Sequence, residues 1–191
     1  AMATGPSILL WRSAVAVLPL EPIPRKRTGG EAGSLGSIGV RFMIDGEKKA
    51  VDEAGLAGKP VAFSDAYEAG GAVSVRPYLD GSQLGALLKE LGFANPWTKI
   101  PGMEGDPAYG LGTTDVEGLT KLPADTLFWY IGNEGEADPY TEALGKNKVW
   151  TGLPFVKAGN VTRLPDAIWM FGGPASMSDF LDAVVKTVQG S

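Results

Sequence analysis

Apolar residues recur at the spacing of a helix face in the middle of the chain. One segment has leucines at i, i+3, i+4 and i+7, namely Leu84, Leu87, Leu88 and Leu91. A helix turns once in 3.6 residues, so these side chains form one stripe that must pack against another element. Gly92 then supplies a typical helix stop. The pattern predicts an amphipathic helix over residues 82–91.

A second helix is predicted at the C-terminal end of the chain. Its apolar side chains fall on one side of the segment that precedes Gly190, at Phe180, Leu181, Val184, Val185 and Val188. Ser176 and Asp179 approximate a capping box, so this helix is expected to begin at Ser176. We expect it to pack on a sheet and close the domain.

Continuous apolar segments predict strands between these helices. Thr126–Ile131 is apolar and aromatic almost throughout, which is typical of a central strand covered on both faces. Shorter strands are expected at 73–75 and at 161–164, the latter ended by Pro165 because proline has no N–H to donate. Strand and helix patterns alternate from Gly58 onward, which predicts an α/β domain.

The first 57 residues lack such a pattern. Several prolines, the cluster Arg25–Arg27 and a run rich in glycine and serine interrupt any long element. We predict an extended lead-in and linker over residues 1–57, with one strand at 14–18 and a short helix at 47–54. The α/β domain is assigned to residues 58–191.

Composition excludes much of common enzyme chemistry. The 191 residues are 44% hydrophobic, enough for a substantial core, and the net charge of -5 argues against nucleic acid as a partner. The chain has no Cys and no His. Thiolate nucleophiles, Cys/His zinc sites and Ser-His-Asp triads are therefore excluded.

Two loops place large apolar side chains beside glycine. Trp169, Met170 and Phe171 precede a Gly-Gly pair, and Tyr109 precedes a single glycine. Irregular backbone that presents such side chains is typical of pocket rims. The alternative is that Trp169 and Tyr109 plug the end of the sheet and that Met170 fills a gap in the core.

The order of these segments resembles the periplasmic-type solute-binding proteins that carry ferric siderophores, haem or cobalamin to ABC importers, mainly their C-terminal lobe. The similar segments are Val75-Arg-Pro-Tyr-Leu79 with the helix after it, residues 109–119 with the strand at 124–130, and Leu153-Pro-Phe-Val-Lys-Ala-Gly-Asn-Val161 with the Trp169 loop and the last helix. Order and spacing make this match more specific than any one motif. A strand at Gly58–Phe63 fits the same pattern.

The resemblance implies a three-layer sandwich with a mostly parallel central sheet flanked by helices, as in the second lobe of a two-lobed binding protein. It implies binding rather than catalysis, with no cofactor and with iron present only inside a bound chelate. The implied partners are a ferric siderophore and an ABC permease. The implied location is extracytoplasmic, periplasmic or at the cell surface, as a lipoprotein anchored through a leader outside this chain.

The resemblance also assigns site residues. It places Tyr109 and Trp169 at the ligand, where the rings would stack on a catecholate or hydroxamate. We assign Arg76 to the same site, where it would hold an anionic complex, and Met170 as an adaptable apolar side chain of the pocket. Arg76 follows strand 73–75 directly, where strand ends meet the cleft in open α/β sheets. An ion pair with a nearby carboxylate such as Asp80 is the alternative for Arg76.

Glu117 matches the acidic residue that docks onto the permease in the resembling family. Asp115 is close enough in sequence to take the same role, and a merely solvated carboxylate is the alternative for both. The acidic segment 133–138 superficially suggests calcium, but its spacing differs from an EF-hand loop, so a solvated loop is the better interpretation. No metal site is predicted.

Two other functions remain open. The family's first lobe is not recognisable before residue 58, and a single lobe offers half a cleft, so a protein interaction or assembly module with the same fold is the main alternative. An α/β enzyme that uses carboxylates alone is the other.

Overall fold

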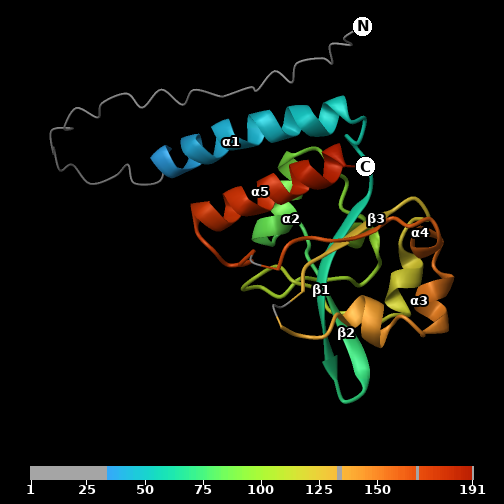
Figure 1. Cartoon of the computed structure of the whole chain (residues 1–191). Coiled ribbons are helices and arrows are strands. Elements are labelled where there is room, and N and C mark those ends of the chain that lie inside the picture. The colour runs from blue at the N-terminus through green and yellow to red at the C-terminus, as the bar shows by residue number, and fades with distance from the viewer. Residues whose placement is uncertain (1–33, 133–134, 167, 191) are drawn as a thin grey trace, which may run out of the picture. The chain divides into compact units, whose positions relative to one another are not determined.

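The computed structural model describes residues 34–132, 135–166 and 168–190 (Figure 1). The strand predicted at 14–18 lies outside the described residues. The strands are β1 (Val61–Ala69), β2 (Ala72–Pro77), β3 (Leu127–Tyr130) and β4 (Val161–Arg163). The α-helices are α1 (Ser34–Glu53), α2 (Gln83–Glu90), α3 (Lys148–Gly152), α4 (Pro154–Lys157) and α5 (Pro174–Gln189). Shorter helical turns are η1 (Pro96–Lys99), η2 (Gly118–Lys121) and η3 (Pro139–Ala143).

The strands form one sheet in the order β2-β1-β3-β4. β1 pairs with β3 and β3 with β4 in parallel, while β2 pairs with β1 in the antiparallel sense. The predicted mostly parallel sheet is confirmed, and β3 lies inside it between two neighbours, as its apolar sequence predicts.

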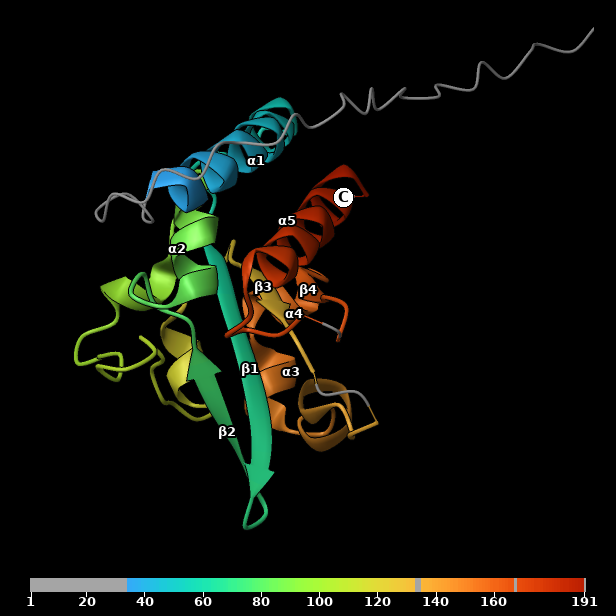
Figure 2. The same ribbon diagram turned by 90° about the vertical axis from the view of Figure 1, so that its left-hand side faces the viewer.

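β1 and β2 form a hairpin that continues past the carboxyl ends of the other strands (Figure 2). Parallel pairing of β1 with β3 ends at Ser64, whereas antiparallel pairing with β2 continues to Ala69. Gly70 and Gly71 connect the two strands at φ of 61° and 82°. A two-residue turn in which both φ values are positive favours glycine, so this glycine pair allows the tight turn between β1 and β2. β1 is therefore longer than the strand expected at 58–63.

Helices α1, α2 and α5 cover one face of the sheet. Their buried side chains pack together with Val61, Phe63 and Trp129 of the strands. The α2 leucines that predict this helix are all buried, and Ser82 caps its first turn by accepting a hydrogen bond from the Gly85 N–H. The predicted helix is confirmed.

The other face is covered by short helices and rich in aromatic side chains. Phe128 of β3 is fully buried at its centre, with ring centroids 5.1 Å from Tyr140, 5.4 Å from Trp150 and 5.5 Å from Phe155. Apolar cores on both faces make the fold a three-layer α/β sandwich, as expected.

Two helix boundaries differ from the sequence predictions. α1 begins at Ser34 rather than at residue 47, so the part of the lead-in from 34 to 53 is helix and not extended chain. It packs along α5 with Ile44 and Val51 buried, and tertiary packing of this kind overrides the low helix propensity of its glycines (Figure 1). Whether residues 1–57 as a whole form a lead-in stays a prediction.

α5 begins at Pro174, before the predicted start at Ser176. Pro174 occupies the first turn, where the missing N–H has no cost, and Gly173 is the N-cap. The capping box at Ser176 therefore does not form. Within the described residues, no helix has the length and apolar character needed to cross a membrane.

Replacing Phe128 should show how much the aromatic face contributes to stability. Phe128→Ala is expected to lower the free energy of unfolding by about 3–5 kcal/mol, because it removes a buried ring and leaves a cavity. The matched control is Phe171→Ala, whose ring is 44% exposed and whose loss should cost less than about 1 kcal/mol. Urea unfolding followed by circular dichroism measures both; equal losses would contradict this view of the core.

Candidate functional site

A pocket of about 250 Å³ lies near the carboxyl ends of the parallel strands. It is formed by three segments that are distant in sequence: residues 78–83 after β2, the loop at 108–111 and the loop before α5. Its main lining side chains are Tyr78, Gln83, Tyr109, Leu111, Met170 and Phe171. Ligands bind at this edge in open α/β sheets, so the pocket is the candidate binding site.

The loop before α5 presents aromatic side chains to solvent. Trp169 is 67% exposed and Phe171 is 44% exposed. The loop is nevertheless held in place: the Gly172 N–H donates to the Trp169 carbonyl at 2.9 Å, and the Gln83 amide donates to the Gly172 carbonyl at 3.2 Å. A Cβ on Gly172 would meet Ser176 Oγ at 2.1 Å, so the tight backbone requires glycine.

Tyr109 lies opposite this loop. It is 55% exposed, and its ring centroid is 4.7 Å from that of Phe171. Asp106 shapes the loop by accepting hydrogen bonds from the N–H groups of Leu111, Tyr109 and Ala108, and these bonds lower the pKa of the Asp106 carboxyl, that from Leu111 contributing most.

Gly110 brings the Tyr109 loop against the start of α2. Its φ is 68°, and an added Cβ would lie 2.4 Å from the backbone nitrogen of Ser82. Only glycine fits this contact.

Arg76 is connected to the pocket through buried polar groups. It forms a bidentate pair with Asp65, directly opposite on β1, with Nε to Oδ1 at 2.7 Å and Nη2 to Oδ2 at 2.5 Å. The Tyr78 hydroxyl donates to Asp65 Oδ2 at 3.3 Å and lies 2.7 Å from Met170 Sδ. Consecutive contacts through Asp65 and Tyr78 therefore link Arg76 to Met170.

The pKa shifts agree with this geometry. The hydrogen bond to Asp65 raises the pKa of Arg76 although burial opposes the rise. Burial, assisted by the charge of Asp65, raises the pKa of the Tyr78 hydroxyl. Tyr78 therefore stays protonated and acts as a donor. The other side of the guanidinium lies over the Tyr67 ring, 5.4 Å from its centroid.

The ion pair of Arg76 is therefore with Asp65 and not with Asp80. Asp80 instead pairs with Lys89, at 2.7 Å. Sequence proximity favours Asp80, whereas the hairpin register places Asp65 directly across from Arg76. Alternation of side chains along β1 could have indicated that Asp65 faces the site, but only once the hairpin is known.

A second arginine at this edge has no counterpart in the predictions. Arg163, the last residue of β4, binds Asp138 through Nη1 at 2.9 Å and Asp166 through Nη2 at 2.8 Å. Asp138 also accepts the Tyr130 hydroxyl at 2.8 Å. Gly132 leaves room for the guanidinium, because a Cβ there would lie 2.4 Å from Arg163 Nη2.

Asp138 caps η3 as well, by accepting the N–H groups of Tyr140 and Thr141. Burial alone would raise the pKa of Asp138, but the hydrogen bonds from Thr141, Tyr130 and Tyr140 outweigh burial and lower it. The interpretation of the whole segment 133–138 as a solvated loop is therefore wrong for Asp138, which is buried. Residues 133 and 134 lie outside the described residues.

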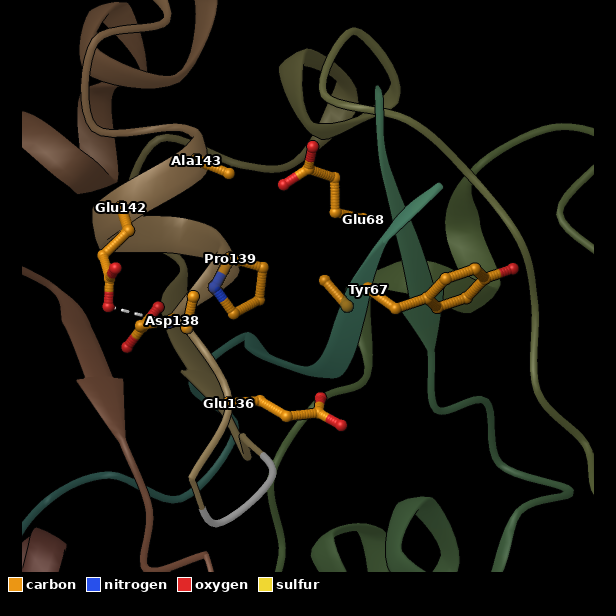
Figure 3. A pocket seen from close by; sticks show the side chains of 9 residues that line it. Tyr67, Glu68, Glu136, Asp138, Pro139, Glu142 and Ala143 are labelled. Atoms are coloured by element: carbon orange, nitrogen blue, oxygen red, sulfur yellow. Dashed lines mark hydrogen bonds between the residues drawn. The ribbon is translucent and has the colours of Figure 1, made fainter. Parts of the chain in front are cut away.

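A larger pocket, of about 590 Å³, is acidic (Figure 3). Glu68, Glu136, Asp138 and Glu142 are among the residues that line it, and the Tyr67 ring points away from it. In the part of the chain that the structure describes, no group of acidic side chains is arranged to hold a metal ion.

Glu117 is exposed at the start of η2 and lines another pocket together with Asp115 and Glu68. The Asp115 carboxylate accepts the Gly118 N–H, whereas Glu117 makes no side-chain cap. Docking through Glu117 stays a prediction.

Comparisons with solved structures report the same fold. The siderophore-binding protein FhuD from Vibrio cholerae, solved with Fe³⁺-Desferal, aligns over 80% of this chain with 19% identity and a TM-score of 0.57. The siderophore periplasmic binding protein from the fuscachelin gene cluster of Thermobifida fusca aligns over 83% with 19% identity and a TM-score of 0.59. The iron-uptake ABC transporter substrate-binding protein PiaA from Streptococcus pneumoniae aligns over 82% with 18% identity and a TM-score of 0.55.

This chain spans little more than half of each of these proteins, namely 53%, 56% and 55% of their lengths. At such low identity the likeness establishes the fold, which is that of a lobe of the siderophore-type periplasmic binding proteins. The expected resemblance is confirmed at this level. These three structures are of siderophore-binding or substrate-binding proteins. No protein-family model and no curated protein matches the chain.

The hydrogen bonds that Asp138 accepts from Thr141, Tyr130 and Tyr140 predict a pH dependence of stability. The pKa of Asp138 is lower in the folded chain than the value of about 4 in an unfolded one, so its contribution is fully present above about pH 4 and is lost as pH falls through the folded pKa. Asp138→Asn should lower the free energy of unfolding at pH 7 by about 2 kcal/mol and flatten its decline below pH 4. Urea unfolding from neutral to acidic pH measures both effects.

The control for that experiment is Asp125→Asn, at an exposed position. It should change the free energy of unfolding by less than about 0.5 kcal/mol. If the free energy of unfolding of Asp138→Asn falls as steeply below pH 4 as that of the wild type, Asp138 is not the cause of the pH dependence.

Proposed function

We propose that this chain is the binding lobe of a solute-binding protein that takes a ferric siderophore to an ABC importer. The observation that supports the proposal most is the pair of exposed rings, Tyr109 and Phe171, that line a pocket at the carboxyl edge of a sheet with this fold, with the exposed Trp169 on the same loop as Phe171. Flat apolar faces suit the aromatic rings or hydroxamate arms of a chelator. Iron would enter already wrapped by its chelator, so shape and stacking would replace protein ligands.

Partner and location follow from the same proposal. The exposed Glu117 would meet a basic side chain of the permease, and the protein would act outside the cytoplasm. Relatives of the fold include components of iron-uptake ABC transporters, which supports this assignment.

Fluorescence gives a direct test in a Trp11→Phe background, because among the tryptophans of the described residues Trp169 is exposed whereas Trp97, Trp129 and Trp150 are buried. Ferric complexes of a trihydroxamate, a tricatecholate and citrate are titrated into the whole chain, with affinity measured in parallel by calorimetry. A bound ferric chelate should quench Trp169. Trp169→Phe should remove most of the quenching, and Tyr109→Ala should weaken binding about tenfold through lost stacking.

Trp150→Phe is the matched control, since Trp150 lies on the opposite face and its replacement should leave quenching and affinity unchanged. Full quenching retained by Trp169→Phe would place the ligand elsewhere. If no chelate binds the folded chain, the proposal fails and the interaction module becomes the better hypothesis, which a native mass measurement of self-association then tests.

A further inference from the structure

Both arginines at the carboxyl edge are already neutralised by carboxylates. Arg76 uses two of its nitrogens on Asp65, and Arg163 is shared between Asp138 and Asp166. A guanidinium paired in bidentate fashion has little charge left to attract an anion.

Arg76 is not free to leave its partner for a ligand. The Asp65 side chain is only 7% exposed, so moving the guanidinium away would leave a buried carboxylate beside Tyr78 without its ion-pair partner. Such a charge without a partner is strongly unfavourable. Asp65 therefore holds the Arg76 guanidinium in a structural ion pair, and the guanidinium is not available to bind an anionic ligand.

The lining of the candidate pocket is neutral. Among the described residues that line the pocket of about 250 Å³, none has a charged side chain. The acidic pocket with Glu68 and Glu142 lies on the other face of the hairpin, away from the Tyr67 ring and Arg76, and adds no charge to this site (Figure 3). The exposed rings of Tyr109 and Trp169 present π faces, which attract cations and not anions.

We propose that this site selects its ligand by charge and takes uncharged or cationic ferric chelates in preference to anionic ones. The inference rests on the proposed function and narrows it. It also reverses the expectation that Arg76 holds an anionic complex, because the structure pairs that side chain with Asp65. Asp65 is the residue that determines this preference.

A series of chelates that differ only in charge gives the test. Ferric desferrioxamine B is cationic through its free ammonium, its N-acetyl derivative is neutral and its N-succinyl derivative is anionic, while the iron centre is the same. At low ionic strength, affinity should fall about two- to threefold for each step toward negative charge. The differences should vanish at about 1 M salt, where the Debye length is about 3 Å.

Two variants assign the preference to residues. Asp65→Asn releases Arg76 and should reverse the order, so that the anionic derivative binds best. Glu68→Gln changes an exposed carboxylate on the other face of the hairpin and should leave the order unchanged, which restricts the preference to the face that carries Asp65. Asp52→Asn, on α1 and 50% exposed, is the control and should leave the series unchanged.

The outcomes separate this inference from the proposed function. Equal affinities for the three derivatives, or tighter binding of the anionic one by the wild type, would overturn charge selection and leave chelate binding standing. Binding of none of the three, nor of any other ferric chelate, would remove the proposed function and this inference with it. If Asp65→Asn does not fold, the order of the three affinities in the wild type and the loss of that order at about 1 M salt decide the question.

Discussion

The pairing of Arg76 with Asp65 is the interaction on which the site depends. Asp65 on β1 lies directly opposite Arg76 on β2. The hairpin register therefore brings the two side chains together, and their ion pair stabilises that register. Because Asp65 is buried, it requires both the guanidinium and the Tyr78 hydroxyl. Tyr78 in turn contacts Met170. Met170 belongs to the loop before α5, residues 168–173, which we call the aromatic loop. One buried carboxylate thus determines where the pocket wall lies.

The aromatic loop is exposed because its backbone is held and not because it is loose. Arg163 binds Asp166 near its beginning, Tyr78 contacts Met170 in its middle, and Gln83 binds Gly172 near its end. Trp169 and Phe171 lie between these contacts and have no place in either core. Holding large apolar rings in solvent has a free-energy cost, which a rigid binding surface recovers when a ligand covers the rings.

The sequence predicts the elements that local pattern controls. The stripe of α2 and the apolar run of β3 follow directly from periodicity, and the loop residues Tyr109 and Trp169 follow from aromatic side chains beside glycine. It does not predict contacts that depend on tertiary register. Asp65 becomes the partner of Arg76 only through the hairpin, and Arg163 reaches Asp138 only because β4 lies beside β3. The N-terminal half of α1 is missed for a related reason, since packing on α5 outweighs its glycines.

The size of the pocket constrains how a ligand would be held. About 250 Å³ is below the range of about 300–1,000 Å³ that encloses a drug-sized molecule, yet the exposed rings extend the apolar surface beyond its rim. Such a surface offers contact area without enclosure, and contact on one side leaves much of a chelate in water. Tight binding therefore requires a second surface that closes over Trp169 and Phe171. Since Arg76 and Arg163 at this edge are both paired with carboxylates, a charge that attracts an anionic chelate would have to come from that second surface, and this edge would contribute shape and stacking.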